Sequence, residues 1–530
     1  SLPDALPFWD GEGVGEGEGL VGAPAALDFG VVALEDRADT QLALFHNRGP
    51  AALVLAGVGL VGPHPGDFLL VSPRADEPRE CQAGVTLLSG EVCGIGVRFA
   101  PALAGLRQAT LQVTLAAALS PGVVALGGSG YASARGDLAA GFPRVRDGDA
   151  GGRSHDLGQG LLSAADGHLW VTGYSTDASG RWAPYLWKLD AHGVPVAGFP
   201  RLLEAPAAAG VGNGYGQALA QDAGGDVWAI GTRFDGLGSF ELLLSRLDAQ
   251  GQPRVGFPRL FGSEAAGRRQ SYGEDLALDP DGLPWVAGRA SNGHYVDLGL
   301  WQFTAAGSLQ PGFPLFDYGL EPISQGAAYG MAISADGFLW VVGHVVVAGN
   351  RDFALWKYST AGVLQRGFPK VRAGDAGGVG DDSGLGVALS PDGRIWATGY
   401  SVNARGDKDF VLWCFDSDGT LDPGFPVIRD ADAGGPGHDE GRALAVDPGG
   451  TVWVTGSSTR PAGDADFALW RFRRDGSPAP GFPLLRHGDA GGAGHDEGRD
   501  LGLGPGGAVW VVGSSGNDRP DNDLVIWKFE

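Results

Sequence analysis

Residues 442–458, with the sequence RALAVDPGGTVWVTGSS, carry the pattern that decides the fold. The pattern recurs along the chain, and the tripeptide Gly-Phe-Pro marks its period, beginning at residues 141, 198, 256, 312, 367, 424 and 481. Successive tripeptides lie 55–58 residues apart. A fixed period of this length is the signature of a repeat architecture in which each copy forms one structural unit.

Tryptophan occupies matching places in the copies. Buried indoles at equivalent places would pack between neighbouring sheets and add a large apolar area to the core, so we predict a structural role for them. The first set is Trp170, Trp228, Trp285, Trp340, Trp396, Trp453 and Trp510, and the second is Trp187, Trp301, Trp356, Trp413, Trp470 and Trp527, with Leu244 in the second copy.

Each copy contains four strand candidates. In the copy at 424–480 they are Phe425–Arg429, Arg442–Val446, Thr451–Ser457 and Phe467–Arg473. Tight turns such as Asp447-Pro448-Gly449-Gly450 separate them, and the whole chain holds 93 glycines and 34 prolines. Four short strands make one propeller blade, so seven copies predict an all-β fold with a seven-bladed β-propeller.

The two ends of the repeat region complement each other. The first Gly-Phe-Pro lacks the three preceding strands of a blade, and the chain stops at Glu530 directly after a third strand candidate, Leu524–Phe529. We predict that Phe142–Arg146 pairs beside Leu524–Phe529, so that both ends of the domain share blade seven and no sheet edge stays exposed.

The repeat resembles a known family in several motifs per copy. In addition to residues 442–458, the stretch Asp466–Phe472 and the turn Asp475-Gly476-Ser477 are similar to the delta-sixty-type bacterial β-propeller repeat. The resemblance covers about residues 141–530. It implies an exported bacterial propeller with no assigned activity.

An earlier segment, about residues 25–132, reads as alternating short strands. Its ordered landmarks include Leu27-Asp28-Phe29-Gly30, Val97–Pro101 and Gly127–Gly130. Together they resemble the choice-of-anchor D (Hydin-like) immunoglobulin-fold domain, which implies an immunoglobulin-like sandwich with a structural or adhesive role. We therefore expect three parts: a tail at 1–24, this domain at 25–132 and the propeller at 137–530.

The first domain also holds two of the three cysteines. Cys81 and Cys93 lie twelve positions apart with turn residues between them. We interpret them as a disulfide, the alternative being two reduced buried thiols. The third cysteine, Cys414, follows Trp413 where other copies carry Lys, Arg or Gln. It is either partly exposed and able to form an intermolecular bridge, or a small residue tucked under a neighbouring strand.

Residues 1–24 begin with an apolar segment followed by an acidic, glycine-rich stretch. The stretch at 10–19 cannot bury apolar surface, and we predict a flexible linker. The segment before it is a candidate docking strand or plug, on a second copy or on its own chain. The candidate assembly residues are Leu2, Leu6, Phe8 and Trp9.

Composition limits the partners. The formal charge of −24 would repel phosphate backbones, so nucleic acid is not an expected partner. No long apolar run is present, which predicts no membrane span. The start Ser-Leu-Pro fits a removed signal peptide and equally fits trimming. With the expected disulfide, we predict an extracellular or cell-surface protein.

Loops between the copies are dense in carboxylates on glycine-rich backbone, which suits calcium. No cofactor is required, and calcium is a candidate ligand. The alternative is that these acids cap backbone N–H groups in solvated turns. The candidate calcium residues are Asp147, Asp149, Asp156, Asp381, Asp382, Asp430, Asp432, Asp439, Glu440, Asp496 and Glu497, and three of the stretches also carry His155, His438 and His495.

Three hypotheses for the function follow. The first is a non-enzymatic extracellular scaffold that assembles with copies of itself or with other surface proteins into filaments or an array; it would show large self-contacts. The second is a monomeric adhesin that binds carbohydrate or protein, with an aromatic patch at one mouth of the propeller. The third is a glycan-cleaving enzyme, with carboxylates and arginines clustered in a deep central pocket. No catalytic motif supports the third hypothesis, so we expect no enzyme activity.

Overall fold

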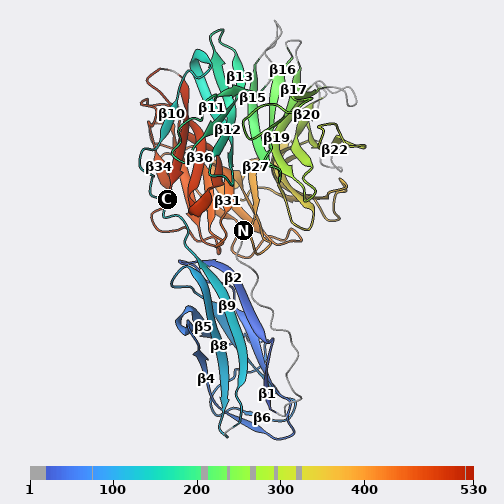
Figure 1. Ribbon diagram of the computed structural model, residues 1–530, viewed down its shortest axis with the longest axis vertical. Coiled ribbons are helices and arrows are strands. Elements are labelled where there is room, and N and C mark those ends of the chain that lie inside the picture. The colour runs from blue at the N-terminus through green and yellow to red at the C-terminus, as the bar shows by residue number, and fades with distance from the viewer. Residues whose placement is uncertain are drawn as a thin grey trace. The chain divides into compact units, whose positions relative to one another are not determined.

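A computed structural model describes residues 19–74, 76–117, 119–203, 213–235, 239–262, 270–291, 296–317, 325–519 and 521–530, without the side chain of Arg153. The chain divides into two compact units, Ser1–Ser133 and Ala134–Glu530 (Figure 1). Both are built from strands with short turns, and the protein is all-β, as predicted. The candidate assembly residues Leu2, Leu6, Phe8 and Trp9 lie outside the described residues.

The first unit contains two sheets. One has the order β1-β3-β7-β5, with β1 Leu20–Ala23, β3 Gln41–Asn47, β7 Val92–Phe99 and β5 Phe68–Val71. The other has the order β2-β9-β8-β4-β6, with β2 Ala26–Ala33, β9 Gly122–Tyr131, β8 Gly105–Leu115, β4 Leu53–Val61 and β6 Thr86–Leu87. A short 3-10 turn, Pro65–Asp67, precedes β5.

One core holds these two sheets together. Along β9, buried residues alternate with more exposed ones, as expected for a strand with one face on a core. Phe45 and Val97 from one sheet and Leu111 and Val124 from the other are fully buried in the same cluster. Strand β1 belongs to this unit, so the expected tail at 1–24 is too long at its C-terminal end.

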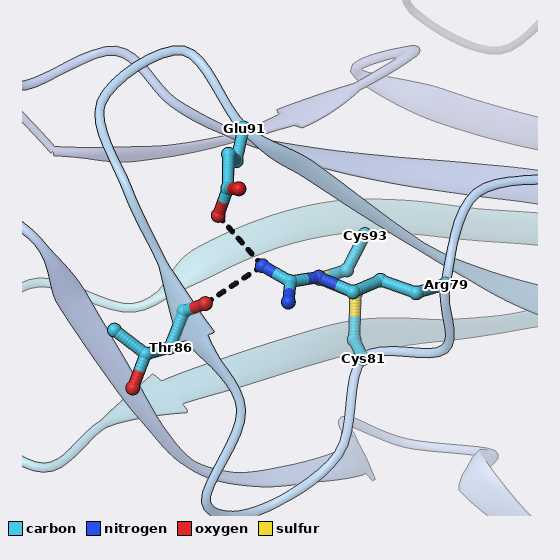
Figure 2. The surroundings of a disulfide bond; sticks show 5 residues. All are labelled: Arg79, Cys81, Thr86, Glu91 and Cys93. Atoms are coloured by element: carbon cyan, nitrogen blue, oxygen red, sulfur yellow. Dashed lines mark hydrogen bonds and ion pairs between the residues drawn. A yellow bond between two sulfur atoms is a disulfide. The ribbon is translucent and has the colours of Figure 1, made fainter.

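A disulfide joins Cys81 to Cys93. Figure 2 shows Arg79 beside it, with its guanidinium 2.7 Å from a carboxylate oxygen of Glu91 and 2.7 Å from the carbonyl oxygen of Thr86. The disulfide therefore ties the loop before β6 to β7, where hydrogen bonds and an ion pair also hold the chain.

The second unit consists, in the described part of the chain, of seven antiparallel sets of four strands, here numbered sheets 1–7. Sheets 2 and 3 are also linked by one parallel pairing, Phe240 with Gln270. Sheet 1 contains β11 Gly151–Ser163, β12 Leu169–Asp177, β13 Trp182–Leu189 and β14 Arg201–Leu202, and sheet 2 contains β15 Gly214–Gln221, β16 Val227–Phe234, β17 Phe240–Leu247 and β18 Arg259–Phe261. Sheet 3 contains β19 Gln270–Leu278, β20 Pro284–Ser291, β21 Val296–Gln302 and β22 Leu315–Asp317, and sheet 4 contains β23 Gly326–Ile333, β24 Phe338–Val347, β25 Asn350–Ser359 and β26 Lys370–Arg372.

Sheets 5–7 continue the pattern, with a 3-10 turn at Pro505–Gly507 in sheet 7. Sheet 5 contains β27 Gly377–Leu389, β28 Ile395–Asn403, β29 Lys408–Phe415 and β30 Val427–Arg429, and sheet 6 contains β31 Asp439–Val446, β32 Val452–Thr459, β33 Ala465–Phe472 and β34 Leu484–Arg486. Sheet 7 contains β35 Glu497–Leu503, β36 Val509–Gly516, β37 Asn522–Phe529 and β10 Arg144–Arg146.

The first strands of the sheets form a closed ring. The seven first strands, in chain order, are β11, β15, β19, β23, β27, β31 and β35. Each of them contacts the next, and the last, β35, contacts the first, β11. The last sheet takes its outer strand from the start of the unit, because Val145 on β10 pairs with Val525 on β37. This pairing confirms the prediction that Phe142–Arg146 lies beside Leu524–Phe529.

The strand that follows each Gly-Phe-Pro belongs to the sheet before it. In the copy at 424–480, Val427–Arg429 pairs with β29 and not with the three strands after it, so reading 424–480 as one blade was wrong by one strand. The turns are as predicted: Gly450 has φ 89° and donates its N–H to the carbonyl of Asp447 at 2.9 Å.

The repeated aromatic residues explain this pairing. Each phenylalanine of the seven tripeptides packs edge-on against the first tryptophan of the sheet that its strand completes; Phe425 and Trp396 are 5.3 Å apart between centroids. The seven pairs are Phe142–Trp510, Phe199–Trp170, Phe257–Trp228, Phe313–Trp285, Phe368–Trp340, Phe425–Trp396 and Phe482–Trp453. The thirteen tryptophans of the repeat positions are buried, which confirms their predicted core role.

Two further residues depart from the repeat pattern. Cys414, on β29, is completely buried in a hydrophobic cluster. The expectation of a partly exposed thiol was therefore wrong, and the alternative of a small residue buried under a neighbouring strand holds. Trp182 differs from the buried tryptophans, because 37% of its surface is exposed.

Among the described residues, no helix has the length and apolarity needed to cross a membrane.

Candidate binding cavity

Every first strand of the second unit carries an irregularity at the same place. In β31, Gly441 pairs with Gly456 and Ala443 pairs with Thr455, so Arg442 between them has no partner on β32. Such a β-bulge adds one residue to a strand and redirects its side chain. The seven bulge residues are Gln159, Gln217, Glu274, Tyr329, Leu385, Arg442 and Arg499.

All seven bulge residues line one cavity of about 530 Å³. Each is half-buried and directly follows a buried glycine or alanine. Second and third strands contribute Arg289, Tyr400 and Lys408 to the wall. Because the first strands form the ring, the bulges bring one side chain from every sheet to a shared space.

Sheets 5–7 form one charged network in this wall. Arg442 lies 3.3 Å from a carboxylate oxygen of Glu440 and 3.0 Å from one of Glu497. Glu497 also pairs with Arg499, and Glu440 pairs with Lys408. Although burial acts to raise the pKa of Glu497, the two guanidinium groups hold that pKa below its usual value.

Sheets 2–4 form a second network. The carboxylate of Glu274 lies 3.1 Å from Nε of Arg289 and accepts a hydrogen bond from Nε2 of Gln217 at 3.0 Å. The guanidinium of Arg289 lies over the rings of Tyr272 and Tyr329, at 4.8 and 5.9 Å from their centroids. Burial raises the pKa of Glu274 despite these partners.

Two more carboxylates in the wall connect neighbouring sheets. Asp500 on β35 accepts the N–H of Leu161 on β11 at 2.7 Å, and Asp275 on β19 accepts the N–H of Met331 on β23 at 2.7 Å. Burial raises the pKa of Asp500 to about 6 and that of Asp275 to about 7. Four cations and four carboxylates therefore line the cavity, and a fifth carboxylate, Glu497, pairs with two of these cations, so the cavity is close to charge balance.

The candidate calcium residues other than Glu440 and Glu497 lie in loops or near the starts of first strands, where protein donors engage them. Asp439 accepts backbone N–H groups of Ala431 and Thr459 at 2.6 and 3.0 Å, and Asp156, Asp382 and Asp496 do the same in their copies. Asp432 binds both Arg429 and the indole N–H of Trp470, as Asp149 binds Arg146 and Trp187. Asp147, Asp381 and Asp430 pair with Arg519, Arg351 and Arg405.

Among the candidate calcium residues, Glu440 lines the cavity, and Glu497 pairs with Arg442, which lines it. The described residues contain no group of three or more His, Cys, Asp or Glu side chains arranged to hold a metal ion. The three repeat histidines connect neighbouring sheets. Nδ1 of His438 accepts the N–H of Lys408 at 3.1 Å, and His155 and His495 accept from Asn522 and Ala465.

Comparison with known proteins supports the architecture. Residues 390–425 match a family described as a domain of unknown function (DUF5122) beta-propeller. This match agrees with the closed ring of sheets, and the second unit is assigned to the β-propellers. No curated protein sequence matches the chain at a significant level.

Several solved structures are similar over most of the chain. The Hadza microbial sialidase Hz136 shares 13% identity, with 82% of this chain and 89% of that chain covered and a TM-score of 0.38. A protein of unknown function from Dyadobacter fermentans shares 14%, with 74% and 99% covered and a TM-score of 0.42. The polysaccharide lyase Uly1 shares 11%, with 72% and 91% covered and a TM-score of 0.44.

The bulge residues were not recognised from the sequence. A signal for them exists, because each directly follows a glycine or alanine that pairs with a glycine of the second strand. The surrounding residues repeat from copy to copy, whereas this position changes between Gln, Glu, Tyr, Leu and Arg. Variation at one position inside a regular repeat marks a site that the shared fold does not dictate.

Proposed function

We propose that the protein is a non-enzymatic extracellular binding protein that recognises carbohydrate in the central cavity of a seven-bladed β-propeller, preceded by an immunoglobulin-like domain. The observation that carries the proposal is the ring of seven bulge residues around one cavity. The disulfide supports an oxidising, extracellular location. The seven sets of strands and the two sheets with a shared core support the two fold assignments.

The chemistry of the wall favours a neutral ligand rich in hydroxyl groups. Guanidinium groups donate hydrogen bonds and carboxylates accept them, and here both kinds stand side by side, as in Arg442 with Glu440 and Glu497. A sugar hydroxyl can accept from the first and donate to the second at once. Because the charges nearly balance, a strongly charged ligand would leave one partner uncompensated. The volume lies within the range of small-molecule sites, about 300–1,000 Å³.

The wall also contains aromatic rings. Tyr215, Tyr329 and Tyr400 line the cavity, and each offers an apolar ring and a hydroxyl group. Sugar rings have one apolar face and a polar edge, and this combination matches them. The scaffold hypothesis rests on the segment before residue 19 and draws no support from this wall; the cavity supports the adhesin hypothesis.

The test is a glycan-binding measurement with the full chain. We would screen it on an array of neutral mono- and oligosaccharides and of uronic-acid oligosaccharides, then measure affinity for the best neutral binder by calorimetry. Leu385→Trp fills the cavity without leaving a charge unpaired, and we expect it to weaken binding at least tenfold. Val363→Trp, at a position 59% exposed, is the matched control and should bind like the wild type.

Equal affinities of the wild type and Leu385→Trp would exclude the cavity as the site. Binding confined to the uronic-acid glycans would contradict the argument from charge balance. Absence of binding to every glycan would overturn the proposed function.

Glycan hydrolysis is a second candidate, because Glu274 is a carboxyl group with a raised pKa in the cavity wall beside arginine. Carboxylates and arginines clustered in a central cavity are also what the enzyme hypothesis requires. Mass spectrometry of the bound glycans after long incubation distinguishes the two functions. Shortened glycans that do not form with Glu274→Gln would establish hydrolysis, and intact glycans would leave binding as the function.

A further inference from the structure

A group of aromatic side chains continues from the cavity across the strands of sheets 1–3, and we call it the aromatic arc. It consists of Tyr174, Trp182, Phe234, Phe240 and Tyr272. The proposed function does not use these residues. From the contacts described below, we infer that the aromatic arc is a second subsite that stacks further sugar rings of an oligosaccharide whose end occupies the cavity; this inference rests on the proposed function.

Neighbouring members of the arc contact each other. The rings of Tyr174 and Trp182 are stacked, with centroids 5.1 Å apart and planes 23° apart. Phe240 lies 5.2 Å from Phe234 and 5.2 Å from Tyr272. These contacts fix the planes of the rings, so a ligand would meet a prepared surface.

Asn213 connects the two parts of the arc across sheets 1 and 2. Its side-chain oxygen accepts the backbone N–H of Trp182 at 3.1 Å, and its backbone carbonyl oxygen accepts the backbone N–H of Phe234 at 2.8 Å. Asn213 therefore joins the backbones of sheets 1 and 2 directly at Trp182 and Phe234.

The two ends of the arc are related to residues of the cavity wall. At one end, Tyr272 lies beneath the guanidinium of Arg289, which lines the cavity. At the other end, burial raises the pKa of Tyr174 to about 12, and the charges of Arg499, which lines the cavity, of Glu497 and of Asp156 act on its hydroxyl group. The contact between Tyr272 and Arg289 therefore joins the arc to the cavity wall.

The repeat gives Trp182 the strand position that a cavity-lining residue has in sheet 5. Trp182 pairs with Thr176 as Lys408 pairs with Val402, and Lys408 lines the cavity. The nitrogen of Lys408 lies 4.0 Å above the ring of Tyr400, in the place where Trp182 stacks on Tyr174 in its own sheet. The same backbone position carries a cation in sheet 5 and an exposed aromatic ring in sheet 1.

Exposure distinguishes Trp182 from the structural tryptophans. It has 37% of its surface exposed, whereas the tryptophans of the repeat positions are at most 4% exposed. An indole left open to solvent offers a flat apolar face, and aromatic rings of this kind are common in ligand sites. The apolar face of a pyranose ring fits such a surface, and a chain of sugars running out of the cavity would bring one there.

The test compares a monosaccharide with the tetrasaccharide of the same sugar, chosen from the array. We expect Trp182→Ala to weaken tetrasaccharide binding about tenfold and to change monosaccharide binding less than twofold. Trp182→Tyr keeps an aromatic ring and should restore tetrasaccharide affinity to within about threefold of the wild type. Thermal unfolding of each variant checks that the fold is intact.

A second readout does not depend on substitution. N-bromosuccinimide oxidises exposed indoles, and peptide mapping locates the modified tryptophan. We expect the tetrasaccharide to protect Trp182 from oxidation and the monosaccharide to leave it reactive.

Each outcome separates the inference from the proposed function. If Trp182→Ala weakens both ligands equally, or neither, or if the tetrasaccharide gives no protection, the second subsite is wrong while the cavity stands. If Leu385→Trp also leaves both ligands unaffected, the proposed cavity function fails, and the inference fails with it.

Discussion

Asp500 accepts hydrogen bonds from two backbone N–H groups, those of Leu161 and Leu501, at 2.7 and 2.8 Å. The first bond crosses from sheet 7 to sheet 1, where the ring of sheets closes. Burial nevertheless raises the pKa of this carboxyl to about 6 from an ordinary value of 3.8, so the folded state holds its proton more tightly than the unfolded state does.

The sign of the pH effect follows from this shift. A raised pKa in the folded state gives stability that is fully present below about pH 4 and is lost as pH rises through about 6. Asp500→Asn removes the titration, so we expect the stability of this variant relative to the wild type to rise by about 2 kcal/mol between pH 4 and pH 7. Urea unfolding at several pH values measures the difference.

Asp177→Asn is the control with the opposite shift. Hydrogen bonds from Ser179 and Arg181 outweigh burial and hold the pKa of Asp177 at about 2. Its contribution is present above pH 4 and is lost only as pH falls through about 2, so the difference from the wild type should stay constant between pH 5 and pH 7. A constant difference for Asp500→Asn as well would contradict the assigned shift of Asp500.

At the scale of strands, local sequence predicted much of the fold. The Asp-x-x-Gly turns and the apolar runs around the tryptophans are short-range signals, and the strand at Val452–Thr459 lies within one or two residues of its expected place at Thr451–Ser457. The role of Phe425 was missed because its partner Trp396 lies in the preceding copy, and the strand after it has only three residues.

The cavity wall was missed for a related reason. A bulge residue such as Arg442 interrupts the period of two that identifies a strand, and a charged residue there resembles any solvent-facing residue. Only the closed ring of first strands shows that seven such positions share one space. Ring closure is a long-range property, which a periodic pattern does not contain.

The closing pair of strands can be tested by a cross-link. Val145 on β10 and Val525 on β37 are direct partners, at a separation that suits a disulfide. We expect Val145→Cys combined with Val525→Cys to form one on oxidation and to raise the melting temperature of the second unit by several degrees, because the link closes a loop of almost the whole unit. Calorimetry of the oxidised protein measures the shift.

Val145→Cys alone is the control, since it keeps the Cys81–Cys93 disulfide and the buried Cys414 unchanged. It should show no rise in melting temperature. Failure of the double variant to oxidise, with both cysteines free after denaturation, would mean that the two strands do not lie together in solution.

At the scale of the whole molecule, the two units are stabilised by different means. The second unit repeats one tryptophan–phenylalanine contact seven times, and each sheet packs on the next. The first unit is small, holds its two sheets on one core and adds a disulfide between the loop before β6 and β7. Small domains gain most from such cross-links because their cores bury less surface.

We therefore expect Cys81→Ser combined with Cys93→Ser to destabilise the first unit by about 3 kcal/mol, the entropy of a short closed loop, and to leave the second unit unchanged. Hydrogen exchange of the full chain, followed by mass spectrometry of its peptides, resolves the two units. Peptides from residues 19–133 should exchange faster, and peptides from residues 134–530 should exchange at the wild-type rate.

Cys414→Ser, a similar substitution at a fully buried position in β29, is the control and should affect only peptides of the second unit. If the paired serine variant also speeds exchange in the second unit, then the two units do not unfold independently, and the disulfide supports the propeller that carries the cavity as well as its own domain.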